Sequence, residues 1–468
     1  MVQNIKFQFL GSWLLALGFL ISSLSFGQSV QQKLKRATQK FLQSPACYSA
    51  NLSFFVADER GRLVYEYRGN KGLSTASTQK IFSSAMALEV LGKNYRYTTT
   101  ASHTGNLNNG VLNGDVVVHS NGDPTLGSWR YEGYKPENFK AQFIQSLKDK
   151  GIQKIEGNLV IDDTYFDFQT IPGGYPWDDL GNYYGTGVWS VNWRENQFDM
   201  FMKGRSMKGF NINMDKIKWV NEVKVGGKSD KSLVFTAPHS NVALINGTLP
   251  KGKKMTVSGS IPNPPYQLAL ELKEEILKSN IAFSGEIITN SQQKINGKEI
   301  IKAPKSNIFF TYQSPTLDKI VYWFLKKSVN LYGETFVKTV GKVKKNKSNY
   351  KSSVAYMKSF WKSKGINPYM INFADGSGLS PQNYASARAE VQALLWAKKQ
   401  PWFNAYYKGF PKQKNGMKMK SGTIRDAKGF AGYHTSKSGK KYVFAIIVNN
   451  YQGWSVSKDL FKILNHLK

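Results

Sequence analysis

The spacing of hydrophobic and polar residues divides the chain into stretches of different texture. Residues 51–69 (NLSFFVADERGRLVYEYRG) alternate with period two on both sides of a polar turn, which predicts two strands. Residues 72–92 (GLSTASTQKIFSSAMALEVLG) are apolar nearly all round in their second half and end in glycine, as expected of a buried helix. A short polar helix is predicted before both, over residues 31–41. From about residue 95 to 301, short β-like runs alternate with Gly, Asn and Pro clusters, so this stretch is predicted to be β-rich.

Helical periodicity returns in the last third of the chain. The segment SPTLDKIVYWFLKKS has Ser314 in position to cap a helix, Pro315 as its first residue and an apolar stripe along one face. Three strand-like runs (GMKMKSGTI, KGFAGYHT and KKYVFAIIVNN) and a helix over residues 457–467 complete the chain. We therefore expect one domain in two parts, split by a β-rich insertion. The expected boundaries are 28–96 and 303–468 for the two parts and 97–302 for the insertion.

The first 27 residues have the composition of a secretory signal peptide. One cation, Lys6, precedes the apolar run FLGSWLLALGFLISSLSF, and the small residues Ser25 and Gly27 stand at positions −3 and −1 before Gln28. A retained membrane anchor is the alternative, but the run is short for a span and no stop-transfer charges follow it. We expect cleavage before Gln28 and export, with the periplasm as the final location.

The chain is strongly basic. It carries 64 Lys and Arg against 31 Asp and Glu, a formal net charge of +33, and the densest patch is KTVGKVKKNKSNYKSS at residues 338–353. For an exported protein the expected polyanions are cell-wall polymer, anionic lipid headgroups or lipopolysaccharide. Nucleic acid is not expected as a partner, because export removes the protein from its compartment. We expect weak association with an anionic wall or membrane surface, with solubility as the alternative role of the charge.

Histidine and cysteine are too scarce for several common kinds of active site. The chain has five histidines, none at metal-ligand spacing from another histidine or an acid. It has one cysteine, which excludes an intrachain disulfide and a Cys-rich metal site. No metal or cofactor is therefore expected. A G-x-S-x-G elbow is absent, which disfavours a Ser-His-Asp triad but leaves it open.

A serine and a lysine stand three residues apart at the start of the predicted buried helix. Ser77 and Lys80 lie on the same helical face at this spacing, so the hydroxyl and the amine can meet. A lone cation at the start of an apolar helix is costly unless it is paired. A lysine whose pKa is lowered by burial and a neighbouring cation can instead take the proton of a serine nucleophile.

Two further short motifs follow the Ser-Lys pair along the chain. S-x-x-K itself occurs six times, but only Ser77 opens an apolar helix after a strand hairpin. S-x-N occurs as SVN at 190–192, in the β-rich stretch, and at 328–330, between two apolar-striped helices. K-S-G occurs at 437–439, in a predicted turn, and at 420–422, which runs into a predicted strand. The combination of S-x-x-K, S-x-N and K-S-G in these settings is far more specific than any member alone.

On these three motifs, with the stretches STASTQK, GDVVVHSNGDPTL, GNLVIDD and DGSGLS, the chain resembles a known family. It is similar to the class C low-molecular-mass penicillin-binding proteins, the D-alanyl-D-alanine carboxypeptidase/endopeptidases. The resemblance covers most of the mature chain, and that family also inserts extra domains between its first two motifs. It implies an α/β (α+β) fold of the serine β-lactamase/DD-peptidase type, with a central antiparallel sheet flanked by helices. Ser421 where Thr is commoner, and Val329 where Asp is frequent, are departures that keep the acting groups.

The resemblance also implies roles for the motif residues. Ser77 attacks the carbonyl of a terminal D-Ala-D-Ala bond in a peptidoglycan stem peptide, and Lys80, neutral when it acts, takes its proton. Ser328 relays a proton to the departing amine, and Asn330 hydrogen-bonds the substrate amide and the Lys80 region. Lys420 keeps the site electropositive and helps to depress the pKa of Lys80. β-Lactam antibiotics are then expected to be covalent inhibitors.

The strand that carries the K-S-G motif is expected to bind the substrate. The hydroxyls of Ser421 and Thr423 bind the terminal carboxylate, with Gly422 between them in the same strand. The backbone N–H groups of Ser77 and Thr423 form the oxyanion hole, and water hydrolyses the acyl-enzyme. Two alternatives remain on the same fold: a β-lactamase, which needs an additional base for fast deacylation, and a non-catalytic peptidoglycan-binding protein, which has no need of a Ser-Lys pair.

Overall fold

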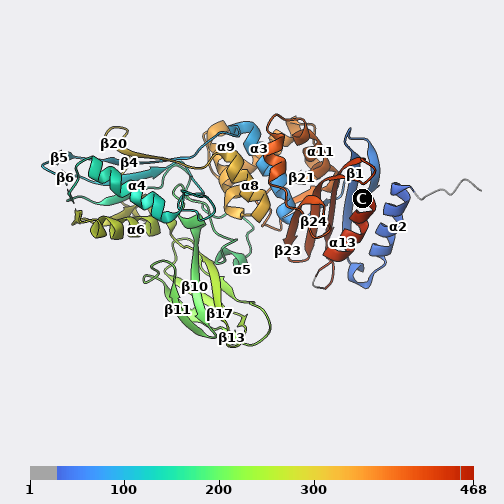
Figure 1. Cartoon of the computed structure of the whole chain (residues 1–468), viewed down its shortest axis with the longest axis horizontal. Coiled ribbons are helices and arrows are strands. Elements are labelled where there is room, and N and C mark those ends of the chain that lie inside the picture. The colour runs from blue at the N-terminus through green and yellow to red at the C-terminus, as the bar shows by residue number, and fades with distance from the viewer. Residues whose placement is uncertain (1–28, 454) are drawn as a thin grey trace, which may run out of the picture.

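The computed structural model describes residues 29–453 and 455–468, so the predicted signal peptide lies outside the described residues. Figure 1 shows an elongated molecule with a helix-covered sheet at one end, a second mixed lobe at the other end, and a third, β-rich lobe that projects from the middle. In this described part of the chain, no helix combines the length and the hydropathy needed to cross a bilayer.

A five-stranded antiparallel sheet brings the two ends of the chain together. Its order is β2 (Leu63–Tyr67), β1 (Asn51–Asp58), β25 (Lys441–Asn449), β24 (Ala427–Thr435) and β23 (Lys418–Ile424). The central pair is β1 and β25, in register from Asn51 opposite Asn449 to Asp58 opposite Tyr442. Strands β1 and β25 are separated by more than 380 residues, so the sheet is complete only when the first and last parts of the domain have come together.

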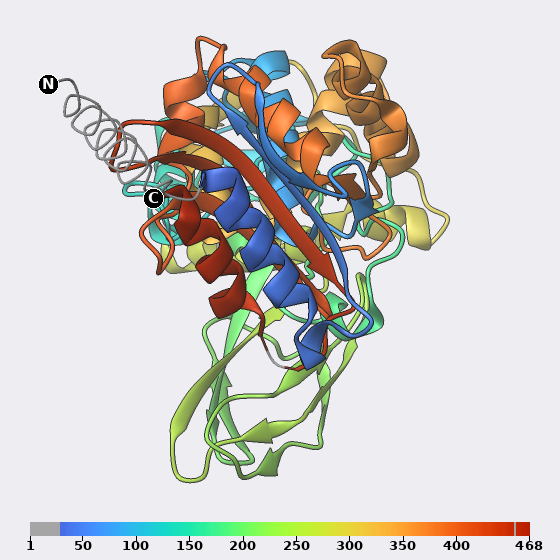
Figure 2. The same ribbon diagram turned by 90° about the vertical axis from the view of Figure 1, so that its right-hand side faces the viewer.

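The period-two pattern of β1 explains why both faces of this sheet are covered. Phe54 and Val56 pack against one apolar cluster, and Phe55 and Ala57 pack against another on the opposite face. The first face carries α2 (Val30–Leu42) and α13 (Ser457–Leu464), which lie side by side in Figure 2. The helices of the second face are α3 (Lys80–Leu91), α8 (Leu317–Lys327), α9 (Asn330–Lys345), α10 (Tyr350–Ser363), α11 (Ala387–Lys398) and α12 (Phe403–Lys408). The predicted fold class is confirmed.

One predicted helix start is wrong. Helix α8 begins at Leu317 rather than at Pro315, with Thr316 at the N-cap position. The side chain of Ser314, expected to cap the helix, is engaged elsewhere: its Oγ accepts from the backbone N–H of Tyr97 at 2.9 Å and donates to the Pro315 carbonyl at 2.7 Å. A contact with Tyr97, which lies just before β4 and more than 200 residues earlier in the chain, therefore takes the place of the expected cap.

The strands between residues 98 and 313 pair only with one another. One sheet has the order β19 (Ile287–Thr289), β9 (Leu159–Asp162), β7 (Val116–Ser120), β4 (Thr98–His103) and β20 (Ile308–Gln313). A smaller one has β18 (Ala282–Phe283), β8 (Lys154–Ile155), β6 (Val111–Asn113) and β5 (Asn106–Asn108). Helices α4 (Pro136–Asp149) and α6 (Pro264–Lys278) share an apolar cluster with these strands, and α7 (Asn290–Ile295) follows β19. Strand β20 pairs with β4 although it begins beyond residue 302, where we expected the insertion to end.

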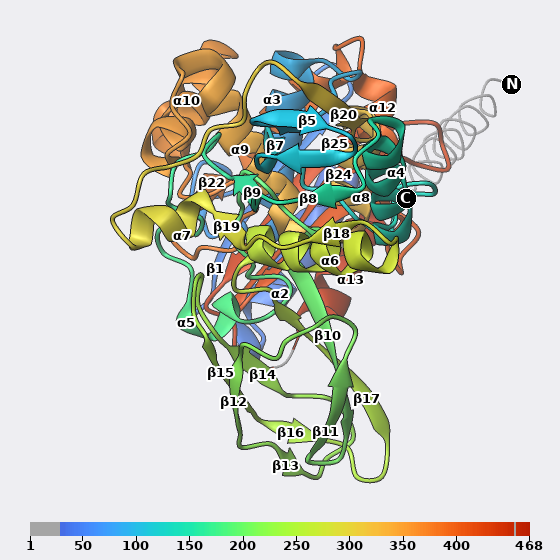
Figure 3. The same cartoon turned by 90° about the vertical axis from the view of Figure 1, so that its left-hand side faces the viewer.

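The projecting lobe is built from short strands, as Figure 3 shows, and it has an apolar core of its own. Its strands are β10 (Gln197–Lys203), β11 (Ser206–Phe210), β12 (Lys218–Asn221), β13 (Lys224–Val225), β14 (Leu233–Phe235), β15 (Val242–Asn246), β16 (Thr248–Leu249) and β17 (Lys254–Ser260). A small sheet of β3 (Gly72–Leu73), β22 (Tyr384–Ser386) and β21 (Ile371–Asn372) lies outside this lobe, next to the start of α3.

Candidate active site

Ser77 lies in a tight turn immediately before helix α3. Residues Ala76–Gln79 form a 3-10 turn, and the α-helix begins at Lys80, so the predicted single helix is divided at this point. Ala76 has a left-handed φ of +45°, which costs roughly 1–3 kcal/mol and persists only where the surroundings impose it. The two side chains meet as their spacing predicts: Lys80 Nζ lies 2.9 Å from Ser77 Oγ.

Lys80 is completely buried, and its amine has two further partners. Its Nζ lies 2.6 Å from Asn330 Oδ1 and 2.7 Å from the backbone carbonyl oxygen of Ser377. Burial lowers the pKa of Lys80 to about 7, although the nearby carboxyl groups of Asp375 and Glu334 act in the opposite direction. The amide oxygen and the carbonyl oxygen can only accept. In a neutral amine they therefore take both N–H groups, and the lone pair points at Ser77.

The S-x-N motif forms the corner between two helices. Helix α8 ends at Lys327, its C-cap residue Ser328 adopts a left-handed φ of +61°, and Asn330 is the first residue of α9. Asn330 Nδ2 donates to the backbone carbonyl of Tyr184 at 2.7 Å, while its Oδ1 faces Lys80. The corner thus places Asn330 against Lys80 and Ser328 at the cavity that Ser77 also lines.

Lys420 lies on the edge strand β23 and is also buried. Its Nζ donates to Ser328 Oγ at 3.0 Å and to the Ser421 carbonyl at 2.7 Å. We expected Lys420 to keep the site electropositive and to help to depress the pKa of Lys80. Burial and the neighbouring Lys80 hold the pKa of Lys420 well below its usual range, and burial is the main cause of the low pKa of Lys80.

Gly422 allows strand β23 to lie directly against the turn that carries the serine. A Cβ at this position would lie 2.4 Å from the Thr75 carbonyl oxygen and 2.9 Å from the backbone nitrogen of Ser77. Such distances are far below van der Waals contact, so no other residue fits without movement of the strand or the turn. The K-S-G glycine is therefore required by the close approach of two backbones.

A cavity of about 770 Å³ opens above these groups. Ser77, Ser328, Asn330 and Thr423 line it, whereas Lys80 and Lys420 lie beneath its surface. Ser421 is half-buried and is not part of the lining. The described residues that line the cavity include no histidine, and among the described residues no group of His, Cys, Asp and Glu is arranged to hold a metal.

The duplicate motifs lie elsewhere and have structural partners. Ser190 Oγ accepts from the backbone N–H of Phe166 at 2.7 Å, and the side chain of Asn192 bonds the backbone of Trp189. The second K-S-G, residues 437–439, lies in the turn between β24 and β25. Structural context therefore separates the motif copies in the way the sequence patterns indicated.

Sequence reasoning missed a second layer of buried groups beneath the serine. Asp375, at the start of DGSGLS, accepts the backbone N–H groups of Ser377, Gly378 and Ser380. This carboxylate shapes the loop whose Ser377 carbonyl contacts Lys80. Glu334 accepts from the backbone N–H of Gly376 at 2.9 Å, and burial raises the pKa of Glu334 to about 8. Glu334 follows Asn330 by one helical turn, a spacing that could have indicated a shared face.

A buried Ser-Lys pair between an antiparallel sheet and a helical layer, with S-x-N and K-S-G side chains at one cavity, defines an active-serine hydrolase of the penicillin-recognising class. The model of the D-Ala-D-Ala carboxypeptidase 3 (S13) family matches residues 34–467, and the chain belongs to that family. It is accordingly a serine-type D-Ala-D-Ala carboxypeptidase, and the predicted family and enzyme class are confirmed.

Relatives of known name cover nearly the whole chain. D-alanyl-D-alanine carboxypeptidase DacB of Haemophilus influenzae is 22% identical over 470 residues, which cover 94% of this chain and 92% of the relative. A D-alanyl-D-alanine carboxypeptidase of Actinomadura sp. is 23% identical over 459 residues, covering 90% and 82%. The crystal structure of penicillin-binding protein 4 (DacB) of H. influenzae superposes with a TM-score of 0.76 at 21% identity, covering 92% of this chain and 97% of that one. Neither alternative, a β-lactamase or a non-catalytic binding protein, is favoured by these matches.

Proposed function

We propose that the chain hydrolyses the terminal D-Ala-D-Ala bond of peptidoglycan stem peptides through an acyl-enzyme on Ser77, as a carboxypeptidase and endopeptidase. The observation that carries the proposal is the buried amine of Lys80, 2.9 Å from Ser77 Oγ and with a pKa lowered to about 7. A lysine in this state is a base near neutral pH, and within the described part of the chain the serine at the cavity is the one hydroxyl that it contacts.

Acylation begins with proton transfer from Ser77 Oγ to Lys80 Nζ as Oγ attacks the carbonyl carbon. The backbone N–H groups of Ser77 and Thr423 stabilise the oxyanion, each contributing about 3 kcal/mol, a typical value for one such donor. The tight packing of Gly422 against the serine turn supports this assignment, because it fixes strand β23 beside the nucleophile.

Departure of D-alanine needs a proton on its amine. Ser328 Oγ lines the cavity and accepts from Lys420 Nζ at 3.0 Å, so it is suited to donate its own proton to the departing amine. It is reprotonated from Lys80, which holds the proton taken from Ser77. Lys420 and the Thr423 hydroxyl face the substrate carboxylate. Water then attacks the acyl-enzyme and releases the shortened peptide.

Labelling with a fluorescent penicillin tests the nucleophile. The wild-type protein should be labelled covalently, and Ser77→Ala should not. Ser438→Ala is the matched control, because Ser438 also belongs to an S-x-x-K sequence but is exposed in the turn between β24 and β25. Labelling of Ser77→Ala, or loss of labelling in the control alone, would refute the assignment.

We also propose that the protein is exported to the periplasm after cleavage before Gln28. The predicted signal peptide supports this location. N-terminal sequencing of the protein from a periplasmic extract should begin at Gln28. An intact Met1 start in a membrane fraction would contradict export in soluble form.

Association with an anionic wall or membrane surface is proposed for the basic corner, defined as residues 335–374. This segment holds nine lysines and no acidic residue. Lys344, Lys345 and Lys347 are exposed at the end of α9, and none of them is in an ion pair with another described residue. Cosedimentation with isolated cell walls and with anionic vesicles should weaken in the triple Gln variant of these lysines. It should persist when Lys251, Lys253 and Lys254 are changed to Gln, which removes the same charge from the projecting lobe.

A further inference from the structure

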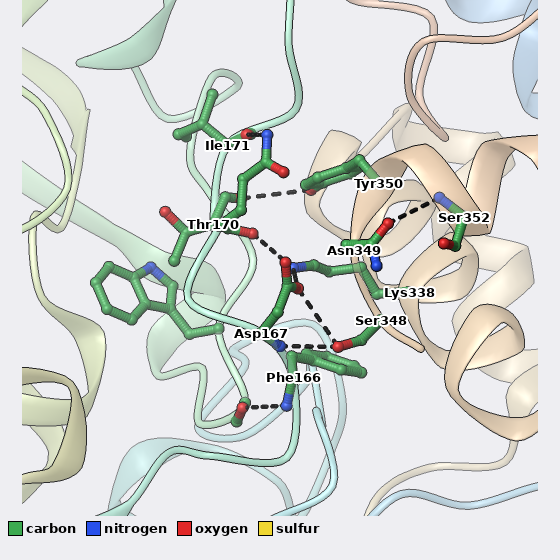
Figure 4. A network of polar contacts seen from close by, with 12 residues as sticks. Phe166, Asp167, Thr170, Ile171, Lys338, Ser348, Asn349, Tyr350 and Ser352 are labelled. Carbon is green, nitrogen blue, oxygen red and sulfur yellow. Dashed lines mark hydrogen bonds and ion pairs between the residues drawn. The ribbon is translucent and has the colours of Figure 1, made fainter. Parts of the chain in front are cut away.

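A segment of the inserted region runs along the helix that carries Asn330. We call residues 166–184 the strap. Its regular structure is confined to the short helix α5 (Trp177–Leu180). It belongs to the region between β9 and β10, yet it contacts α9 of the other part of the chain at three levels. Figure 4 shows the level farthest from the serine, where the strap faces α9 and α10.

The contacts follow one stripe of α9. Asn330, Glu334 and Lys338 are spaced by four residues, so they share a face of the helix. Asn330 Nδ2 donates to the Tyr184 carbonyl at 2.7 Å, and the Tyr175 hydroxyl donates to Glu334 Oε1 at 2.9 Å. Lys338, farthest along the helix, contacts Asp167 near the start of the strap. The strap and the helix therefore run antiparallel.

Lys338 forms an ion pair that ties the start of the strap to α9. Its side chain is completely buried, with Nζ 2.6 Å from Asp167 Oδ1 and 2.5 Å from the Gln169 carbonyl. The backbone N–H of Asp167 donates to Ser348 Oγ at 2.8 Å, and the Tyr350 hydroxyl donates to the Thr170 carbonyl at 3.3 Å, as drawn in Figure 4. Separation of strap and helix would leave a buried lysine without its partner, so this end of the strap is fixed.

The other end of the strap reaches the first acceptor of Lys80. A backbone carbonyl can only accept, so the Tyr184 carbonyl must face the NH₂ group of the Asn330 amide. The oxygen of that amide is then the atom that faces Lys80 Nζ at 2.6 Å. A reversed amide would present a donor to the amine and would turn its lone pair away from Ser77.

The middle of the strap reaches the second acceptor. The Tyr175 hydroxyl lies 3.1 Å from Ser377 Oγ, and the carboxyl group of Glu334 that it also contacts holds the backbone N–H of Gly376. The carbonyl of Ser377 is the group that contacts Lys80 at 2.7 Å. The strap thus hydrogen-bonds to both residues that accept from the Lys80 amine, Asn330 and Ser377.

We propose that the strap is a positioning element for the catalytic base, which holds Asn330 and Ser377 so that the lone pair of Lys80 points at Ser77. The inference rests on the function proposed above. Tyr175 is its most direct positioning residue, because it touches both the helix and the Ser377 loop but does not line the cavity. A strap that only tied two parts of the chain together would affect stability without changing how Lys80 acts.

Tyr175→Phe tests this distinction, since it removes one hydroxyl and keeps the ring. We would measure acylation by a chromogenic β-lactam and separate the noncovalent dissociation constant from the acylation rate constant. The acylation rate constant should fall roughly tenfold, as expected for a modest misplacement of a base. The dissociation constant should stay within about twofold, because the substrate does not meet Tyr175. Tyr433→Phe is the control: its hydroxyl donates to the Leu394 carbonyl at 2.8 Å, so it loses a comparable buried bond away from the site.

A second variant tests whether the Asp167–Lys338 ion pair affects Lys80 through the same strap as Tyr175. Asp167→Asn keeps the side-chain shape and removes the charge that faces Lys338. It should also lower the acylation rate constant, and the double variant with Tyr175→Phe should lower it by less than the product of the two effects. Acylation of Tyr175→Phe at the rate of Tyr433→Phe, or multiplicative effects in the double variant, would overturn the proposal. If wild type is labelled and Ser77→Ala is not, such a result leaves the proposed function intact.

Discussion

Lys80 and Asn330 are 250 residues apart in the sequence, and the amine of the first lies 2.6 Å from the amide oxygen of the second. The contact joins the start of α3 to the start of α9, across the long inserted region. The proposed base is therefore complete only when both parts of the split domain are assembled. Its properties can be tested by pH and by substitution.

The acylation rate constant should rise with pH between about pH 6 and pH 8. Only neutral Lys80 can take the proton of Ser77, and burial lowers the pKa of Lys80 to about 7. The neutral fraction consequently grows as the pH rises through this value. Acylation by a chromogenic β-lactam, followed by stopped flow over this range, measures the effect. A rate constant that is flat or falls over the range would show that the base is another group.

Lys80→Arg should abolish acylation, because a guanidinium cannot give up its proton in a protein. Lys420→Arg should retain measurable acylation, because arginine can still donate to Ser328 and carry charge toward the substrate carboxylate. Rates of the two variants would be compared after circular dichroism has shown that both are folded. Acylation of Lys80→Arg within about tenfold of wild type, or about 1.4 kcal/mol, would exclude Lys80 as the base.

Gly422→Ala should lower the acylation rate strongly and the stability of the folded protein only moderately. The added methyl would lie 2.4 Å from the Thr75 carbonyl oxygen, so strand and serine turn must separate. We expect a destabilisation of about 1–3 kcal/mol and an acylation rate lower by roughly 100-fold. Gly226→Ala is the control, because a Cβ at Gly226 meets only a methyl group at 3.8 Å. Equal rates for both variants would show that the close approach is not needed for catalysis.

Glu390→Gln should change the pH dependence of stability. Glu390 is completely buried below the serine turn, accepts from Thr78 Oγ1 at 2.5 Å, and has a pKa raised to about 8 by burial. The folded protein therefore keeps a proton that the unfolded chain releases above about pH 4.3. Stability should fall between pH 5 and pH 7.5 by up to about 1.4 kcal/mol per pH unit from this group. The melting temperature of wild type should thus drop relative to Glu390→Gln over this range, and parallel curves would contradict the assignment.

The sequence was most informative where a feature depends on neighbours in the chain. The meeting of Ser77 and Lys80 follows from a spacing of three residues at the start of a helix. The strands β1 and β2 follow from their alternation, and the edge position of β23 agrees with a motif that runs into a strand. Residue patterns of this kind are local, and tertiary contacts did not override them.

Features that depend on contacts between distant parts of the chain could not be predicted from local sequence patterns. The start of α8 was misplaced because Ser314 bonds to Tyr97 rather than to its own helix. The low pKa of Lys420 follows from complete burial beside another lysine, which a strand pattern does not reveal. The contacts of Tyr175 with Glu334 and Ser377 join three segments whose proximity only the fold determines.

The central position of β25 has a consequence for synthesis of the protein. Strand β25 separates β1 and β2 from β24 and β23, and it is made after all of them. A growing chain therefore exposes the unpaired edge of β1 until residue 449 has been made, and closure of so long a loop is slow. The sheets of the inserted region, by contrast, need no residue beyond Gln313 and can form earlier. A chain that stops before residue 441 lacks the strand that joins the two halves of the sheet, so penicillin reactivity should arise only at the end of folding.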